Sequence, residues 1–413
     1  MGHSAHLVFT VLNKEFSPMN GLWAGWPRQT CRTLQVPAVA LVMDCMRRAL
    51  LLGTVVAFLL APGTASACSW PTKSDLDTTN VAFPDEGATY WVTRYTGVPG
   101  TEVVIRGRYP DARYFSFHIY DEALRPLASV ADFETTPDAN GGYTTGFSFD
   151  APQSGALMYR VYVSGVAGDP AGGVPLPDIS LRAAGSEEEL ALGQCEPLPP
   201  TTGGALSDAI REANYPAEAP RGFNVASTDP PTTERFYGFD RIVLNPIPSN
   251  PVTDAVPRSD GGFWSNRHIA YLTTRFARRD DGRELLVYRF RAPSAPGQVR
   301  YWSVCQNELA TQRYVECVAD YEAVVDDEGF ATVVISDPED RPANAENWLP
   351  WGGPYYDGLV IYRHMLPAPD FAEAIQNVPE GTPAAEVMGD YFPQVAYCSR
   401  ATFEAGGAAA CLS

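Results

Sequence analysis

The 413-residue sequence contains almost no lysine and little histidine. Lysine occurs only at Lys14 and Lys73, so arginine supplies nearly all of the 30 basic side chains. These face 49 acidic side chains, which gives a net charge of −19. Such acidity disfavours nucleic acids and anionic membrane surfaces as partners. It is compatible with cations, with neutral glycans, or simply with solubility.

The chain also lacks the short motifs of common enzyme chemistry. It has no G-x-S-x-G nucleophile elbow, phosphate-binding loop, dinucleotide-binding glycine pattern, C-x-x-C pair or H-E-x-x-H helix. Three histidines follow residue 67, namely His118, His268 and His364, and nothing in their spacing indicates a metal site. We therefore expect no cofactor and no metal, and we leave open whether the protein is an enzyme.

A membrane-spanning hydrophobic run is missing as well. The apolar run of residues 49–60 is too short to cross a bilayer. It follows the basic Met46-Arg-Arg48 and precedes an A-x-A signal at residues 65–67, which together indicate a secretory signal peptide cleaved near Ala67. We expect residues 1–67 to be a leader with a misplaced start, the alternative being a cytoplasmic extension with a signal anchor.

After the leader the same pattern occurs twice. Three segments recur in the same order, at offsets of 181, 187 and 188 residues. The pairs are Ala88-Thr-Tyr-Trp-Val-Thr-Arg-Tyr95 with Ile269-Ala-Tyr-Leu-Thr-Thr-Arg-Phe276, Arg113-Tyr-Phe-Ser-Phe117 with Arg300-Tyr-Trp-Ser-Val304, and Val130-Ala-Asp-Phe-Glu134 with Val318-Ala-Asp-Tyr-Glu322. Ordered matches at nearly one offset indicate an internal duplication. We refer to residues 68–195 as copy one and to residues 263–413 as copy two.

Both copies have the pattern of short β-strands separated by turns, in a chain with 35 glycines and 36 prolines. This predicts an all-β fold with two tandem copies of a β-sandwich or jelly-roll-like domain. A Pro-rich linker, residues 196–262, joins the copies, and one or two short helices are expected. The expected strands are 90–96, 101–106, 114–120, 143–149 and 157–163, then 270–276, 284–290, 301–306, 331–335 and 359–363. The expected helices are 207–214 and 370–376.

Six of the eight cysteines follow the cleavage site. An even number in an exported chain predicts three disulfides. Cys305 and Cys317 lie on adjacent predicted strands, at positions that hold His118 and Ser129 in copy one, and should form a cross-strand bond. Pairing Cys398 with Cys411 would close the tail, and pairing Cys68 with Cys195 would bracket copy one, although other connectivities are open. Lipidation of Cys68 is the alternative, and it would leave one thiol over.

One part of copy two resembles a known family. Arg300-Tyr-Trp-Ser-Val304, Asn347-Trp-Leu-Pro350 and Leu359-Val-Ile-Tyr-Arg-His-Met-Leu-Pro367 are similar to the C-terminal signature of bacterial exported proteins with the domain of unknown function numbered 1214. Those proteins often carry a second domain, numbered 1254. The resemblance covers mainly residues 263–368. It implies a tandem β-sandwich, and it implies neither an established activity nor catalytic residues.

Repeated carboxylates are one candidate for chemistry. In a strand, the two acids of each pair would point to one face, about 7 Å apart, which is near the range for inverting glycoside hydrolysis. Their repetition favours a structural role instead, with Arg113 and Arg300 as partners. The alternative function is a hydrolase at the domain junction that uses such carboxylates with His118 or His364. The pairs are Asp132 with Glu134 and Asp320 with Glu322.

An aromatic and amide cluster in copy two is the candidate binding site. Aromatic faces stack on sugars or other rings, and amides give directed hydrogen bonds. Ordinary sandwich core is the alternative interpretation. The predicted ligand-binding residues are Trp302, Gln306, Asn307, Trp348, Trp351, Tyr355, Arg363 and His364, with Tyr356, Trp264, Asn266 and Arg267 as possible additions.

We therefore expect an exported double β-sandwich protein that acts as a non-catalytic ligand- or glycan-binding or surface module. A glycan or a small apolar ligand is the expected partner. The alternatives are the hydrolase described above and a structural envelope protein without a small ligand. Comparison of the copies suggests that repeated residues form the shared scaffold. A single site would then be sought among unrepeated residues, mostly in copy two.

Overall fold

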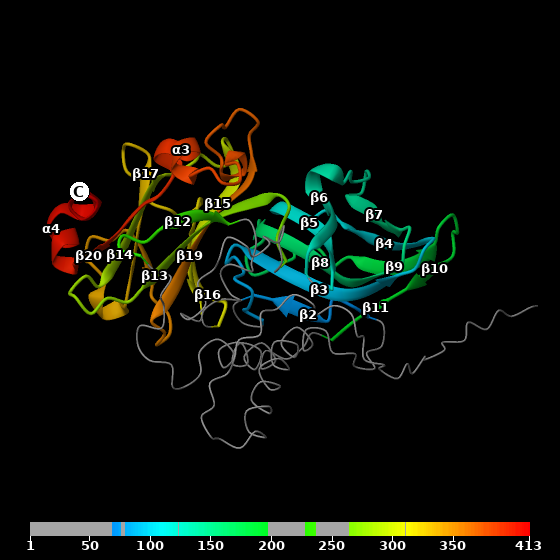
Figure 1. Ribbon diagram of the computed structural model, residues 1–413. Helices are drawn as coiled ribbons and strands as arrows, with labels where there is room; N and C mark the ends of the chain where they lie inside the picture. Colours follow the sequence, from blue (N-terminus) through cyan, green and yellow to red (C-terminus); the bar gives the residue numbers. More distant parts are fainter. Residues whose placement is uncertain (1–67, 76–78, 123, 197–227, 237–263, 310) are drawn as a thin grey trace, which may run out of the picture. The chain divides into compact units, whose positions relative to one another are not determined.

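The computed structural model describes residues 68–75, 79–122, 124–196, 228–236, 264–309 and 311–413. These residues belong to one compact unit and consist mostly of β-strands with a few short helices (Figure 1). The all-β class predicted from the sequence is confirmed. Each copy pairs a five-stranded sheet with a four-stranded sheet around an apolar core.

The five-stranded sheet of copy one has the order β2-β3-β8-β5-β6, and its four-stranded sheet has the order β10-β9-β4-β7. A short strand at the start of the copy pairs in parallel with one at its end. The strands are β1 Cys68–Ser69, β2 Thr72–Ser74, β3 Ala88–Gly97, β4 Thr101–Arg108, β5 Ala112–Asp121, β6 Pro126–Ala131, β7 Gly142–Phe149, β8 Gln153–Ser164, β9 Asp178–Ala183, β10 Glu189–Ala191 and β11 Gly193–Gln194.

Copy two repeats this plan, with the sheet orders β12-β13-β19-β15-β16 and β18-β17-β14-β20. Strand β12 comes from the predicted linker, so the described part of that linker extends a sheet. The strands are β12 Thr233–Phe236, β13 Ile269–Ala277, β14 Leu285–Arg291, β15 Val299–Glu308, β16 Arg313–Ala319, β17 Phe330–Ser336, β18 Asn347–Pro350, β19 Asp357–Pro367 and β20 Gln394–Cys398.

The described helices are short. The predicted helix 370–376 is wrong except for its end, because only a 3-10 turn forms there, between Pro369 and Pro379. The predicted helix 207–214 lies outside the described residues. No described helix has both the length and the apolar character needed to cross a membrane. The helices are η1 Asp132–Glu134, η3 Pro338–Asp340, η4 Ile375–Asn377, α3 Ala384–Met388, η5 Gly389–Tyr391 and α4 Arg400–Cys411.

Alternation along the central strands buries both faces of each five-stranded sheet. In β5, Phe115 and Phe117 face the sandwich core. Tyr114 and Ser116, which alternate with these two residues along the strand, point to the opposite face and are also buried, both at 0% exposure. A strand buried on both faces requires a second layer, and the other copy provides it.

The two copies contact each other through equivalent residues, so many contacts made by copy one have a counterpart made by copy two. A junction core combines Tyr114 and Tyr162 of copy one with Tyr301 and Met365 of copy two. The rings of Tyr162 and Tyr301 lie 5.6 Å apart in a T-shaped arrangement. Equivalent surfaces of two like units thus pack on each other, as they do in an isologous dimer.

Reciprocal ion pairs tie this junction. Arg113 binds Asp320 at 2.5 Å, and Arg300, its equivalent in copy two, binds Asp132 at 2.6 Å. The side chains of Asp320 and Asp132 are only 4% and 11% exposed, so the pairs are largely shielded from water. The arginines are the partners that the sequence suggested, and the structure shows that each pair joins one copy to the other.

The prediction that both acids of each pair lie on one face of a strand is wrong. Asp132 and Glu134 belong to the 3-10 helix η1, and Asp320 and Glu322 follow β16 in a turn. In copy one, the Glu134 carboxylate folds back to accept the N–H of Ala131 at 2.9 Å. This local hydrogen bond closes the turn and separates the acid from its neighbour.

All three predicted disulfides are present. Cys305 and Cys317 are directly opposite each other in β15 and β16, as His118 and Ser129 are in β5 and β6. The other two bonds are Cys68–Cys195 and Cys398–Cys411. The last one joins β20 to the end of α4, a helix that contains two adjacent glycines and gains a covalent constraint.

Replacing either aspartate of the two reciprocal ion pairs with asparagine should lower the stability of the folded protein. We expect Asp132→Asn and Asp320→Asn each to lower the free energy of unfolding by about 1–3 kcal/mol, because each leaves a partly buried arginine without its partner. Asp121→Asn is the matched control, since Asp121 pairs with Arg125, which is 61% exposed. Urea unfolding measures the three values. Equal losses in all three variants would show that the junction pairs have no special role.

Candidate functional site

A cavity lies at the junction of the copies, between their five-stranded sheets. Its volume is about 130 Å³, and its lining is mostly apolar. Both copies contribute, since strands β3 and β8 face it from one side and β13 and β19 from the other. Its lining includes Val81, Phe83, Val92, Ala156, Met158, Phe236, Leu359 and Ile361, with the polar residues Tyr90, Arg160, Tyr162, Asn266, Tyr271 and Arg363.

Two equivalent arginines line this cavity. Arg160 in β8 and Arg363 in β19 occupy matching positions, opposite Tyr90 and Tyr271 in the neighbouring strands. They are only 1% and 3% exposed. In each guanidinium, Nη1 is buried and has no hydrogen-bond partner among the described residues. Arginine keeps its charge in proteins, so the cavity contains buried positive charge.

Each arginine is held by a loop of the other copy. Arg363 donates from Nη2 to the carbonyl of Phe83 at 2.8 Å, and Arg160 donates from Nη2 to the carbonyl of Trp264. Phe83 and Trp264 are equivalent residues, and both have positive φ, 54° and 61°. This backbone conformation is uncommon for aromatic residues and turns each loop onto the opposite sheet. The loops therefore position both arginines.

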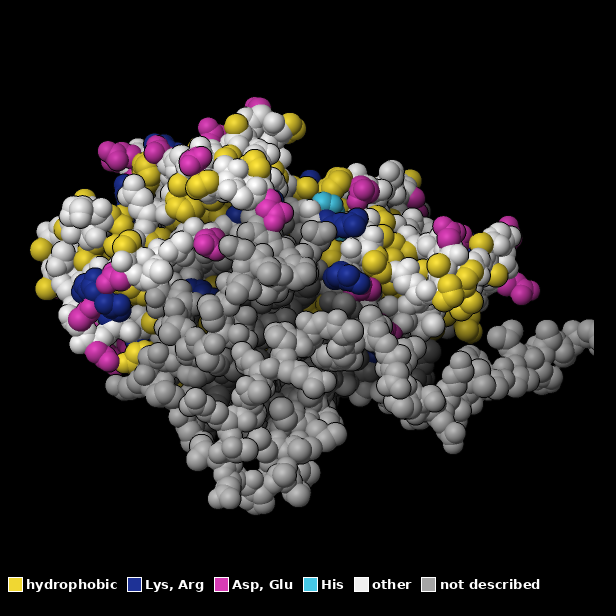
Figure 2. All heavy atoms as spheres, viewed as in Figure 1, with side chains coloured by type: hydrophobic (Ala, Val, Ile, Leu, Met, Phe, Trp, Pro, Cys, Tyr) yellow, Lys and Arg dark blue, Asp and Glu magenta, His cyan; other side chains and the backbone are white. Residues whose placement is uncertain are grey.

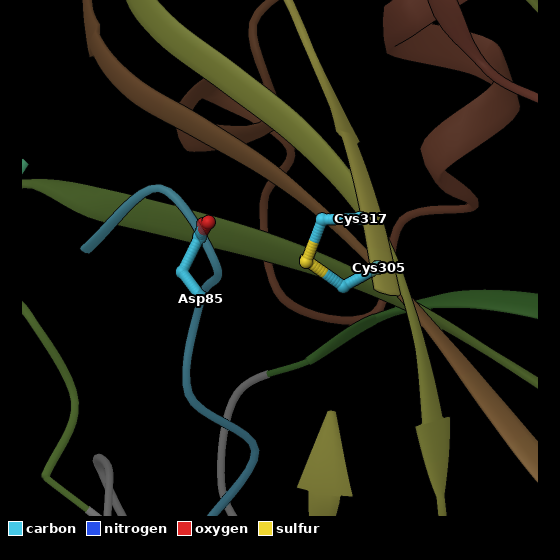
Figure 3. A group of neighbouring side chains, drawn as sticks. All are labelled: Asp85, Cys305 and Cys317. Carbon is cyan, nitrogen blue, oxygen red and sulfur yellow. A yellow bond between two sulfur atoms is a disulfide. The ribbon is translucent and has the colours of Figure 1, made fainter. Parts of the chain in front are cut away.

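Asp85 is the buried carboxylate of this region. It accepts hydrogen bonds from the hydroxyls of Tyr301 and Ser303, each at 2.7 Å. Its carboxylate also lies beside the sulfurs of Cys305 and Cys317, all within 4.8 Å of one another (Figure 3). Such a trio could hold a metal only with free thiolates, and here the two sulfurs are bonded to each other. Asp85 therefore acts as a hydrogen-bond acceptor and counter-charge at the junction.

Two of the three histidines meet at the junction, since the ring centres of His118 and His268 lie 5.8 Å apart, whereas His364 lies apart from them in the core of copy two. His118 lies on the junction face of β5, where its Nδ1 is 3.2 Å from the hydroxyl of Ser116. His364 contacts the hydroxyl of Tyr362 on the core face of β19. His118 and Ser116 form a pair of the kind that activates a nucleophile, but both are 0% exposed. The geometry thus gives the hydrolase alternative no accessible reacting group among these residues.

Most of the aromatic and amide cluster predicted in copy two belongs to the protein interior. Trp302 and Trp351 are core residues, and the Trp302 indole donates to the carbonyl of Pro293. Gln306 donates to the carbonyl of Trp351, and Asn307 to that of Leu359. Asn307 Oδ1 and the Trp351 indole nitrogen have no partner among the described residues, but both are buried within the fold, so the cluster offers little to a ligand.

The remaining predicted residues are divided between other surfaces and the cavity. Trp348 donates to Ser336, and the carbonyl of Tyr355 accepts from Arg278, both away from the junction. Arg363 and the added residues Trp264 and Asn266 line the cavity. Sequence reasoning missed the role of Arg160. The available signal was an arginine within an otherwise apolar strand, which is rarely buried without a partner.

The outer surface gives less indication of a site. On the face shown in Figure 2, acidic and basic side chains are interspersed over the coloured atoms and form no large patch of one sign. The junction cavity is therefore the better candidate on geometric and chemical grounds, since ligand sites are typically concave and apolar with a few convergent polar groups.

No protein-family model matches the chain, and no curated protein is similar to it. Among solved structures, an uncharacterized protein from Burkholderia cenocepacia is 15% identical, over 81% of this chain and 88% of that chain, with a TM-score of 0.47. A structural-genomics target from Vibrio parahaemolyticus is 13% identical, over 78% and 92%, with a TM-score of 0.39. A partial N-terminal region of an enterococcal surface protein is 9% identical, over 82% and 97%, with a TM-score of 0.18. Scores this low carry no argument about function, and the resemblance to the two domains of unknown function stays a prediction.

Burial of His364 should make stability depend on pH. Burial lowers the pKa of His364 from 6.5 to about 3. His364 Nδ1 accepts a hydrogen bond from the backbone N–H of Ile375. A proton on Nδ1 would make both groups donors, and the hydrogen bond would be lost. Between the two pKa values only the unfolded chain binds this proton, and stability should fall by about 1.4 kcal/mol per pH unit of acidification.

His364→Gln tests this expectation. Stability of the wild type should decrease more steeply than that of His364→Gln as the pH falls from about 6.5 towards 3, as measured by urea unfolding at several pH values. His268→Gln is the control, because His268 is only half-buried and its pKa is less strongly lowered, again by burial. Parallel pH profiles for the wild type and His364→Gln would contradict the assignment.

Proposed function

We propose that the protein binds a small, mainly apolar organic molecule in the cavity between its two copies. The observation that carries this proposal is the cavity itself, a partly open space of about 130 Å³ that is lined by both sandwiches and by the two buried arginines Arg160 and Arg363. Domain junctions are a preferred place for ligand sites. The cavity resembles such a site more closely than any surface feature of the described residues does.

The size and lining of the cavity support a small ligand. An apolar cavity of roughly 150 Å³ can accommodate benzene. The side chains of Val92, Met158 and Ile361 offer apolar contact but no hydrogen bonds to match the many hydroxyls of a sugar. Of the two partners expected from the sequence, a small apolar molecule thus fits the cavity better than a glycan.

We also propose that the protein is exported and works outside the reducing cytosol. Three disulfides in one chain are typical of exported proteins. The apolar run at residues 49–60 and the A-x-A signal fit a cleaved signal peptide. Cys68 is bonded to Cys195, which leaves its sulfur unavailable for lipid attachment and favours a soluble secreted or envelope-space form over the lipoprotein alternative.

Filling the cavity should abolish binding without unfolding the protein. Small benzene-ring and short-chain compounds, both neutral and charged, should raise the melting temperature of the wild-type protein, because they bind only the folded state. Val92→Phe places a ring in the cavity, and we expect it to remove this stabilisation. Differential scanning fluorimetry over a fragment set measures the shifts.

Val98→Phe is the matched control, because Val98 is 54% exposed in the turn after β3. It adds the same phenyl group to the same copy and should leave the shifts unchanged. If no compound stabilised the wild type, or if Val92→Phe retained every shift, the cavity would not be the binding site.

A further inference from the structure

The two cavity arginines differ in their counter-charge. Arg363 lies beside Asp85, with Nε 3.6 Å from a carboxylate oxygen, and both side chains are buried. The residue equivalent to Asp85 in the other loop is Asn266. Arg160 therefore faces a neutral amide where Arg363 faces a carboxylate, and it forms no ion pair with any described acid. Of the two buried arginines, Arg160 is thus the one without a counter-charge among the described residues.

The closest described contacts of Arg160 are with neutral groups. Its guanidinium carbon lies 5.5 Å from the ring centre of Tyr120 and 5.7 Å from that of Tyr90. Its Nη2 donates to the carbonyl of Trp264, and its Nη1 has no partner in the part of the chain that the structure describes. Aromatic faces and a carbonyl stabilise a cation only partly, and a buried charge without a counter-ion costs several kcal/mol. An anion in the cavity would relieve this cost.

Asn266 supplies a second unused donor beside the cavity. The backbone N–H of His268 donates to Asn266 Oδ1 at 2.9 Å, and this contact fixes which end of the amide is the oxygen. Asn266 Nδ2 thus points the other way, and it is buried with no partner among the described residues. Asn266 is 3% exposed and lines the cavity together with Arg160. Both residues thus line the cavity, and each has a buried donor without a partner among the described residues.

We infer that the ligand is a small organic carboxylate whose anionic group binds Arg160 and Asn266. This inference rests on the proposed function and specifies its ligand class. A carboxylate can accept hydrogen bonds from a guanidinium and a neighbouring amide. Its apolar part lies against Val92, Met158 and Ile361. One uncompensated charge matches a monoanion, whereas a dianion such as phosphate would leave a negative charge buried.

Asn266→Asp is the sharpest test, because copy one already shows how the fold accommodates aspartate there. The N–H of Gly87 donates to Asp85 Oδ1 at 3.0 Å, and Tyr301 donates its hydroxyl to the same oxygen. In copy two, the N–H of His268 and the hydroxyl of Tyr114 make the equivalent contacts to Asn266 Oδ1. Aspartate at position 266 should therefore fold normally and neutralise Arg160 from within the protein.

The experiment compares benzoate with the neutral benzyl alcohol by isothermal titration calorimetry. We expect Asn266→Asp to weaken benzoate binding by about thirtyfold or more, which corresponds to ~2 kcal/mol, and to leave benzyl alcohol binding nearly unchanged. Asn140→Asp is the control, because it adds the same charge at an exposed turn, and it should preserve the binding of both probes.

Arg160→Met gives an independent test if Asn266→Asp does not fold. It replaces the cation with an apolar side chain of similar length, and it should abolish the preference for benzoate over benzyl alcohol. The inference is overturned if both probes bind the wild type equally well, or if benzoate binds Asn266→Asp or Arg160→Met as tightly as the wild type. Failure of both probes to bind the wild type would overturn this inference without excluding other cavity ligands, which the fragment screen addresses separately.

Discussion

Two arginine–aspartate pairs that cross between the copies hold the junction on which the site depends. Arg113 binds Asp320, and Arg300 binds Asp132, so each copy supplies one cation and one anion to the other. These contacts press the outer faces of the two five-stranded sheets together and cover the tyrosines of β5 and β15. The same apposition leaves the cavity between β3 and β8 on one side and β13 and β19 on the other.

Because the two copies pack through equivalent surfaces, a residue that occurs in both copies can belong to the cavity as well as to the shared scaffold. In a tandem protein whose domains act separately, a residue present twice usually belongs to the common scaffold. Here equivalent residues meet, so Arg160 and Arg363 line one cavity and the loops at Phe83 and Trp264 hold them in the same manner. The two halves differ at several positions, and the exchange of Asp85 in one loop for Asn266 in the other changes the counter-charge of the arginine. The contrast between the two halves determines which arginine remains uncompensated.

Local patterns explain why so much of the fold could be predicted. Strands such as 114–120 alternate aromatic side chains with the period of a pleated strand, and the internal repeat doubled the signal for each of them. The disulfide between Cys305 and Cys317 followed from their place on neighbouring strands. The turn at Asp132–Glu134 was missed because a carboxylate that folds back on the Ala131 N–H is a local contact that strand periodicity does not reveal. The helix at 370–376 was overestimated for a similar reason, since flanking prolines limited it to one turn.

The candidate site could be found only from contacts between residues that lie far apart in the sequence. The sequence by itself determined the duplication, the β-strands, the pairing of Cys305 with Cys317 and the shortage of lysine and histidine, since these depend on neighbours in the chain or on composition. Only the tertiary structure decided that Trp302 is core and that Arg160 lines a cavity. Both are residues of apolar strands, and periodicity shows that a strand has two faces without showing what covers each one. The second face of these sheets is covered by the other copy, a contact between residues far apart in sequence that no local pattern encodes.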